Sequence, residues 1–229
     1  MNLEEKGILG AGMTSLRTRQ RLVERLTEQG IKDIRILEVI RDTPRHLFLD
    51  EALSSRAYED LALPIGYRQT ISQPYVVARM TEVLIESKKL ESKPINKALE
   101  IGTGCGYQTA ILSRFSNSVD SIERIKALHD KAIFNLNNLK IKNVRFLLDD
   151  GEGLQNYNDE YDAILVAAAP QEVPSYLLNK LTIDGRLICP VGDRKSQKLT
   201  FIKRLSKNEY ETLFLDDVLF VPMLKGLVE

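Results

Sequence analysis

The sequence contains no tryptophan, only two cysteines and two histidines, and no excess of charge of either sign. Among its 229 residues, lysine plus arginine and aspartate plus glutamate each number 32. This balance, without a block of basic residues, argues against nucleic acid or an anionic membrane as the principal partner. No apolar run approaches the roughly 18 residues needed to cross a bilayer, and the start MNLEEKG lacks the basic-then-apolar order of a signal peptide. We therefore expect a cytoplasmic protein.

The few thiols and imidazoles give no sign of a metal centre. Cys105 falls in a glycine-rich segment and Cys189 in an apolar run, and neither has a histidine close to it in the sequence. Because no ligand spacing typical of metal sites is present, we predict reduced, buried cysteines and no bound metal. His46 and His129 also lack partners along the chain, so we interpret both as structural or exposed.

The N-terminal part of the chain has the apolar spacing of helices. Thr14 can cap a first helix, which Gly30 ends. A second helix is expected from near Asp33 until Pro44, since proline cannot continue it. A third is expected after QTISQPY, with one apolar face made of Val76, Val77, Met80, Val83 and Leu84.

From residue 97 the pattern changes to strands that alternate with helices. The apolar runs KALEI, SVDSIE, VRFLLD, YDAILVAA and GRLICPV are separated by helical or turn segments. This order predicts an α/β fold with a doubly wound, mostly parallel, Rossmann-like sheet, preceded by the N-terminal helical segment. KLTFIKRL and YETLFLDDVLFVPML, joined by a turn at Lys207 and Asn208, predict an antiparallel C-terminal edge.

Three glycines follow the first strand of this region, in EIGTGCGY. At Gly102, Gly104 and Gly106 the missing Cβ lets the backbone turn sharply and approach a ligand closely. A dinucleotide fingerprint would need a glycine at Tyr107. The spacing G-x-G-x-G instead resembles motif I of S-adenosylmethionine-dependent methyltransferases, and a plain strand-to-helix turn is the alternative.

Acidic residues end the next two strands. Glu123 lies about twenty residues after the glycines, where its two oxygens could accept hydrogen bonds from both hydroxyls of a ribose. Asp149 or Asp150 could accept a hydrogen bond from an adenine amino group, with Gly151 leaving room for the base. The alternatives are a surface ion pair for Glu123 and a simple Asx turn for the aspartates.

A longer series of motifs resembles one family. GMTSLRTR, PRHLF, DEAL, LPIG, QTISQPYVVARM, LEIGTGCGYQTAIL, SIERI, DGEG, YDAILVAAAP, LICPVG and FVPMLKG follow in the order and spacing of the protein-L-isoaspartate O-methyltransferases. The resemblance implies an enzyme that transfers a methyl group from S-adenosyl-L-methionine to the free α-carboxylate of L-isoaspartyl residues. The product S-adenosyl-L-homocysteine is released, and repair of the damaged protein or peptide begins. It also implies a single domain of residues 1–229, in which about residues 1–95 cover the substrate and cofactor and about 96–229 form the core. We expect a monomer.

The resemblance also implies roles for individual residues, of which Ser72 matches the catalytic serine. The residues implied at the cofactor are Thr70, Ile71, Glu100, Gly102, Thr103, Gly104, Gly106, Tyr107, Glu123, Asp150, Gly151 and Leu224. A carboxylate substrate with a pKa of about four is already ionised at neutral pH, so no general base is required. A hydroxyl can orient this anion without neutralising it. Local sequence alone favours Ser72 as the N-cap of the helix that follows, with Pro74 in its first turn.

Three departures from the family pattern bear on the site. The family commonly has Gly-Asp-Gly followed by Trp where this chain has Asp149 to Glu152, which bears on the adenine contact. Arg68 stands where a small residue is frequent, which bears on peptide preference, and Ala167 replaces a frequent Thr. The alternative function is a related small-molecule O-methyltransferase. A catechol-type enzyme would need acidic metal ligands at strand ends, and a base-methylating one would show a polar-aromatic motif at the AAAP segment.

Overall fold

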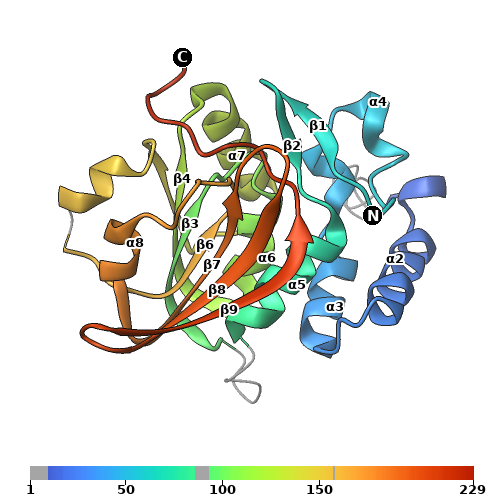
Figure 1. Ribbon diagram of the computed structural model, residues 1–229. Helices are drawn as coiled ribbons and strands as arrows, with labels where there is room; N and C mark the ends of the chain where they lie inside the picture. The colour runs from blue at the N-terminus through green and yellow to red at the C-terminus, as the bar shows by residue number, and fades with distance from the viewer. Residues whose placement is uncertain (1–9, 86–92, 157) are drawn as a thin grey trace.

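A mostly parallel sheet runs through the middle of the molecule (Figure 1). The computed structural model describes residues 10–85, 93–156 and 158–229, and within them the strand order is β5-β4-β3-β6-β7-β8-β9. The strands are β3 (Ile95–Ile101), β4 (Ser116–Glu123), β5 (Val144–Leu148), β6 (Tyr161–Val166), β7 (Leu181–Gly192), β8 (Gln197–Ser206) and β9 (Glu209–Val218). β3 to β7 pair in parallel, whereas β8 and β9 are antiparallel. The predicted fold class is confirmed.

Side chains that alternate along the central strands build an apolar core on each face of the sheet. Ala98 and Leu165 belong to one cluster, whereas their neighbours Leu99 and Ile164 belong to the other. The first face is covered by α5 (Pro74–Ile85), α6 (Tyr107–Phe115) and α7 (Lys126–Asn138). The second face is covered by η4 (Glu152–Asn156) and α8 (Ser175–Asn179). Helices on both faces explain why these strands are almost continuously apolar.

The N-terminal helices are η1 (Gly12–Thr14), α2 (Leu16–Glu28), α3 (Ile34–Asp42), η2 (Arg45–Phe48) and α4 (Glu51–Ser54). Of these, α2 and α3 pack beside α5 (Figure 1). α3 begins next to Asp33 as predicted, and Asp33 caps it, because its side chain accepts the N–H of Arg35 at 3.0 Å. The prediction that Thr14 caps the first helix is wrong. Ser15 occupies the N-cap position, and the Thr14 hydroxyl instead bonds both backbone groups of Ala11, at 2.9 and 3.0 Å.

A short antiparallel hairpin brings the QTISQP segment to the sheet. It consists of β1 (Leu63–Gly66) and β2 (Gln69–Ile71). Tyr67 and Arg68, at its tip, have φ angles of +52° and +57°. Positive φ at both turn residues matches the twist of a tight hairpin, although side chains adopt it at some cost. The turn at Arg68 is therefore strained, and it lies directly before the residues expected to act in catalysis.

The chain after β9 crosses the carboxyl ends of the parallel strands. We call residues 219–229 the C-terminal strap (Figure 1). Ala169, after β6, donates its N–H to Val221 and accepts the N–H of Met223, at 2.8 and 2.9 Å. Farther along, Val228 donates to the carbonyl of Arg124 at 2.9 Å. The strap is thus attached near the ends of both β6 and β4.

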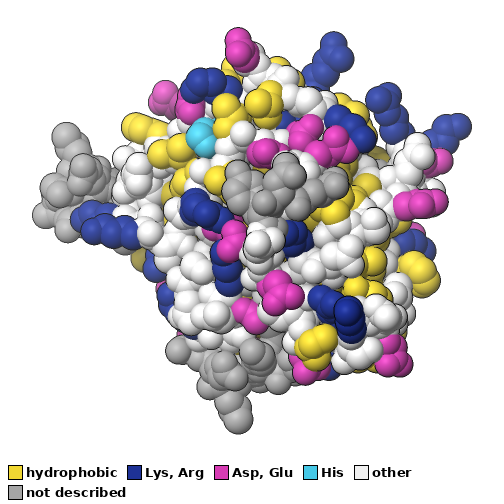
Figure 2. Space-filling model, turned by 90° about the vertical axis from the view of Figure 1, so that its left-hand side faces the viewer, with side chains coloured by type: hydrophobic (Ala, Val, Ile, Leu, Met, Phe, Trp, Pro, Cys, Tyr) yellow, Lys and Arg dark blue, Asp and Glu magenta, His cyan; other side chains and the backbone are white. Residues whose placement is uncertain are grey.

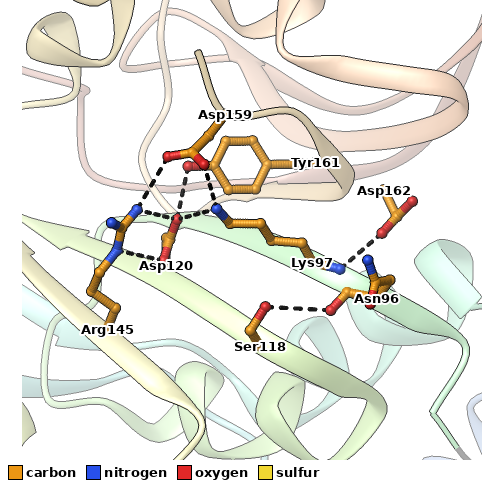
Figure 3. A network of polar contacts seen from close by, with 8 residues as sticks. All are labelled: Asn96, Lys97, Ser118, Asp120, Arg145, Asp159, Tyr161 and Asp162. Atoms are coloured by element: carbon orange, nitrogen blue, oxygen red, sulfur yellow. Dashed lines mark hydrogen bonds and ion pairs between the residues drawn. The ribbon is translucent and has the colours of Figure 1, made fainter. Parts of the chain in front are cut away.

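An ion network joins the strands near their opposite, amino ends (Figure 3). Asp120 of β4 is 3% exposed and accepts both Nε and Nη2 of Arg145, at 2.8 and 2.6 Å. The Tyr161 hydroxyl donates to the same carboxylate at 2.9 Å, and Lys97 Nζ lies 3.3 Å away. Asp159 joins both cations, 2.7 Å from Lys97 and 3.3 Å from Arg145. The network therefore connects β3, β4, β5 and β6.

None of the described helices is long and apolar enough to cross a membrane. The expected division near residue 95 lies beside residues 86–92, which are outside the described part of the chain, as are residues 1–9.

Candidate active site

A cavity opens at the carboxyl ends of β3, β4 and β6. The strand order reverses here, since β4 lies on one side of β3 and β6 on the other, and such positions bind ligands in open α/β sheets. The lining residues are Gln69, Thr70, Ile71, Ser72, Val77, Ile101, Gly102, Thr103, Gly104, Cys105, Tyr107, Gln108, Ile122, Glu123, Arg124, Ile125, Asp149, Asp150, Ala167, Ala168, Val221, Pro222, Met223 and Leu224.

The glycine loop between β3 and α6 needs its glycines for two different reasons. Gly102 and Gly104 line the cavity with φ angles of +92° and +57°, which only glycine adopts readily. Gly106 does not line the cavity. Its role in the structure is one of packing, which differs from the predicted contact with the cofactor. A Cβ there would come within 2.6 Å of the Leu136 side chain. Gly106 therefore lets the start of α6 pack closely against α7.

Glu123 lies at the end of β4, with its carboxylate on the cavity wall. Its Oε2 accepts the N–H of Gly104 at 2.8 Å, and its Oε1 accepts the N–H of Ile125 at 2.9 Å. Glu123 is 6% exposed, and within the described chain its carboxylate bonds to backbone N–H groups. This arrangement differs from the surface ion pair that was the alternative. Each carboxylate oxygen can accept a further hydrogen bond. The carboxylate can therefore still accept the predicted hydrogen bonds from the ribose hydroxyls.

Glu100 lies beneath the glycine loop and does not line the cavity, so the structure does not support the predicted cofactor contact. Its Oε2 accepts the hydroxyls of Thr109 and Ser121, at 2.5 and 2.6 Å. Ser121 in turn lies 2.7 Å from the hydroxyl of Thr103, which does line the cavity. Oε1 is buried and has no partner among the described residues. Burial is the main cause that raises the pKa of Glu100 to about 7.

Asp149 and Asp150 line the cavity and also form the Asx turns that were the alternative to an adenine contact. Asp149 accepts the N–H of Gly151 at 2.7 Å, and Asp150 Oδ1 accepts that of Glu152 at 3.0 Å. Asp150 Oδ2 accepts the N–H of Gly226 at 2.7 Å, which attaches the C-terminal strap and is the main cause that lowers the pKa of Asp150. Gly151 is not among the lining residues, but a Cβ there would meet Ile101 at 3.5 Å and Met223 at 3.8 Å, which both line the cavity, so its contact with the cofactor stays a prediction.

Ser72 lies between this cavity and a second one. The second cavity is lined by Ala62, Thr70, Ser72, Gln73, Val76, Ala167 and residues 217–221. Thr70, Ser72, Ala167 and Val221 belong to both sets of lining residues. α5 begins at Pro74, and the carbonyl of Gln73 accepts its first helical bond, from Val77. The capping role that local sequence favours for Ser72 is therefore wrong, because its hydroxyl bonds to no backbone N–H in the described chain.

Several other cavity residues are not singled out by the sequence as site residues: Gln69, Val77, Ile101, Gln108, Ile122, Arg124, Ile125, Ala168, Val221, Pro222 and Met223. Gln69 and Gln108 flank motifs that the sequence does indicate, so proximity in sequence could have found them. Val221, Pro222 and Met223 lie in FVPMLKG, beside the predicted Leu224. Arg124 and Ile125 line the cavity because the strap pairs with them.

The cysteines and histidines match their predicted structural roles in part. Cys105 and Cys189 are free and buried, although Cys105 also lines the cavity. Burial raises the pKa of the Cys105 thiol to about 11, so it is protonated at neutral pH. His46 is buried and lies 2.8 Å from the Tyr58 hydroxyl. His129, which lacks a partner by sequence pattern, lies 3.1 Å from Asp130.

Comparison with known proteins identifies the family to which the chain belongs. The family model described as protein-L-isoaspartate(D-aspartate) O-methyltransferase (PCMT) matches residues 17–227. The protein-L-isoaspartate O-methyltransferase of Pseudomonas paraeruginosa is 52% identical over 214 residues, which cover 93% of this chain and 99% of that protein. The enzyme of the same name from Cellvibrio japonicus is 50% identical, with coverage of 95% and 96%.

A solved structure agrees with the same assignment. It is a candidate protein-L-isoaspartate O-methyltransferase from Plasmodium falciparum, in complex with S-adenosyl-L-homocysteine. Its TM-score is 0.77 at 26% identity, and the match covers 91% of this chain and 99% of that one. Motifs, fold and relatives agree, and the chain belongs to the protein-L-isoaspartate(D-aspartate) O-methyltransferase family.

Proposed function

We propose that this protein transfers a methyl group from S-adenosyl-L-methionine to the α-carboxylate of L-isoaspartyl residues in damaged proteins and peptides, and so initiates their repair. Family membership carries the activity. The position of Ser72 indicates where the methyl group is transferred. Ser72 lines two adjoining cavities, one beside the glycine loop and one next to the end of β9. A donor in the first cavity and a peptide in the second would meet at this hydroxyl.

The first cavity suits S-adenosyl-L-methionine. Gly102 and Gly104 expose backbone where a side chain would fill space, and Glu123 has lone pairs for the ribose hydroxyls. We propose that the cofactor is held by the lining members of the predicted set: Thr70, Ile71, Gly102, Thr103, Gly104, Tyr107, Glu123, Asp150 and Leu224. Glu100 and Gly106 would support these residues from behind, and Gly151 would contact the cofactor as predicted. When bound, the cofactor supplies an electrophilic methyl group.

The protein's contribution to the reaction is orientation. The substrate carboxylate is ionised at neutral pH, so no side chain has to remove a proton from it. We propose that the Ser72 hydroxyl donates a hydrogen bond to one carboxylate oxygen and thereby fixes the direction of the other. Ala167, small and shared by both cavities, leaves room for the peptide backbone beside it. Enclosure between the hairpin and the strap would exclude water.

We also propose that the chain acts as one methyltransferase domain and as a cytoplasmic monomer without nucleic-acid or membrane partners. About residues 1–95 would cover the substrate and cofactor, and about 96–229 would form the core. Free, buried cysteines suit a reducing compartment. On the face shown in Figure 2, acidic and basic side chains are interspersed, which does not suit a polyanion. Light scattering with and without nucleic acid tests the monomer and its lack of this partner.

The activity is tested by methyl transfer from labelled S-adenosyl-L-methionine to a matched pair of peptides. One peptide contains an L-isoaspartyl residue and the other contains normal aspartate at the same position. Label that enters only the isoaspartyl peptide supports the proposal. Equal labelling of both, or labelling of a small-molecule acceptor alone, would contradict it.

A further inference from the structure

The first turn of α5 is capped by a side chain from outside the helix. Asp60 Oδ1 accepts the N–H of Tyr75, the second residue of α5, at 2.9 Å. Asp60 Oδ2 accepts the side-chain amide of Gln73, just before the helix, at 3.0 Å. Backbone N–H groups in a first turn have no partner within the helix, and a carboxylate there also interacts favourably with the helix dipole. Asp60 therefore provides what a local N-cap residue ordinarily provides.

Asp60 occupies the position for which Ser72 would otherwise compete. Ser72 precedes Tyr75 by three residues, the spacing at which a serine hydroxyl accepts an N–H at a helix start. In this structure the Tyr75 N–H is already bonded to Asp60. The Ser72 hydroxyl makes no such bond within the described chain and lines both cavities instead.

The segment that carries Asp60 is itself held firmly. Arg45, which is fully buried, donates from Nε to the carbonyl of Ala57 at 2.9 Å and from Nη2 to that of Leu61 at 3.3 Å. Gln29, after α2, donates to Asp60 Oδ2 at 2.9 Å. The carboxylate is thus fixed from both sides, and its position does not depend on Ser72.

We propose that Asp60 is a positioning residue for methyl transfer. By capping α5 from outside, it leaves the Ser72 hydroxyl available to the substrate carboxylate. Without Asp60, the Ser72 hydroxyl caps the Tyr75 N–H and is lost to the substrate. The inference rests on the proposed role of Ser72. It adds that Asp60, from another part of the chain, determines whether the Ser72 hydroxyl is available.

The kinetic test compares Asp60→Ala with Asp60→Asn, since asparagine caps helices about as well as aspartate does. With an isoaspartyl peptide, Asp60→Ala should lower kcat by at least about tenfold, about 1.4 kcal/mol of barrier. Asp60→Asn should stay within about threefold of wild type. Binding of S-adenosyl-L-homocysteine should change less than twofold in both variants. The matched control is Asp50→Ala, because Asp50 is exposed and pairs with Lys131 on the surface. An asparagine variant as slow as the alanine variant would overturn the proposal.

A double-mutant cycle followed by thermal unfolding tests, without any activity measurement, whether Ser72 replaces Asp60 as the cap of α5. In the wild-type background, Ser72→Ala should shift Tm by less than about 1 °C, because its hydroxyl caps nothing. In the Asp60→Ala background it should lower Tm by a further 2–4 °C or so, since the hydroxyl then caps α5. Equal shifts in both backgrounds would overturn the inference. If instead the cycle shows coupling but Ser72→Ala alone leaves kcat unchanged, the proposed function of Ser72 is wrong, and so is the positioning role that rests on it.

Discussion

Glu123 Oε2 accepts the backbone N–H of Gly104 at 2.8 Å, so a residue at the end of β4 holds the loop that follows β3. The loop residue and the carboxylate both line the cavity. This bond, with that from Ile125 to Oε1, fixes the carboxylate before any ligand arrives. A site preorganised in this way spends less binding energy on ordering its own groups.

The first prediction concerns this carboxylate. Glu123→Gln should weaken binding of S-adenosyl-L-homocysteine by roughly ten- to a hundredfold, because one oxygen and the negative charge are lost to the ribose hydroxyls. Isothermal titration calorimetry measures the change. Glu82→Gln is the matched control, since Glu82 also accepts two backbone N–H groups, from Lys32 and Asp33, but does not line the cavity. Equal losses in the two variants would show that the effect is not local to the cofactor site.

The second prediction separates catalysis from cofactor binding. Ser72→Ala should lower kcat with an isoaspartyl peptide by at least about tenfold, because the substrate carboxylate loses its orienting donor. Affinity for S-adenosyl-L-methionine should change less than twofold. Ser118→Ala, an exposed serine near the amino ends of the strands, serves as the control. Turnover of Ser72→Ala within twofold of wild type removes this residue from the mechanism.

The third prediction concerns pH and stability. Glu100 has a pKa of about 7 in the folded protein against an ordinary 4.5, so folding favours its protonated form. This contribution to stability is complete below pH 4.5 and is lost as the pH rises through 7. Relative to Glu100→Gln, which does not titrate, the wild-type protein should lose about 3 kcal/mol of unfolding free energy between pH 4.5 and 8. Urea unfolding of both proteins across this range measures it, and parallel pH profiles would refute the assignment.

The fourth prediction concerns the ion network of Figure 3. Asp120→Ala removes a 3%-exposed carboxylate and leaves Arg145, Lys97 and the Tyr161 hydroxyl without their common partner. The free energy of unfolding should fall by about 2–4 kcal/mol, somewhat less than for a fully buried pair because Arg145 is half-exposed. Asp130→Ala breaks exposed pairs with Lys126 and His129 and should change the free energy of unfolding much less. Denaturant titrations compare the two. Cofactor affinity should stay unchanged, since the network lies near the amino ends of the strands.

The arrangement of the sheet could be predicted because its signal is local. Runs such as KALEI and YDAILVAA show their burial directly in their composition, and their alternation with helices permits few topologies. The hairpin turn Lys207–Asn208 is likewise found where expected, between β8 and β9. Thr14 was misassigned as a cap because two adjacent hydroxyl residues fit the same local rule.

The site was predicted less completely, because its details depend on contacts between distant parts of the chain. Gly106 belongs to the loop motif and has a φ angle of +90°, which favours glycine, but its close approach to Leu136 on another helix has no sign in the motif. Glu100 stands at a motif position, but Ser121 and Thr109 direct it away from the cavity. The capping of α5 by Asp60 has no signature in the sequence around Ser72. Periodicity and motif spacing describe neighbours along the chain, whereas these roles arise only after folding.

The C-terminal strap also governs when the cavity can form during synthesis. Val221, Pro222, Met223 and Leu224 line the cavity and follow every other lining residue in the chain. The bonds from Gly226 to Asp150 and from Val228 to Arg124 come later still. A nascent chain can therefore assemble its parallel strands on the ribosome while the cofactor site stays open along one side. We therefore expect ribosome-bound chains stalled before residue 221 to have an incomplete cofactor site.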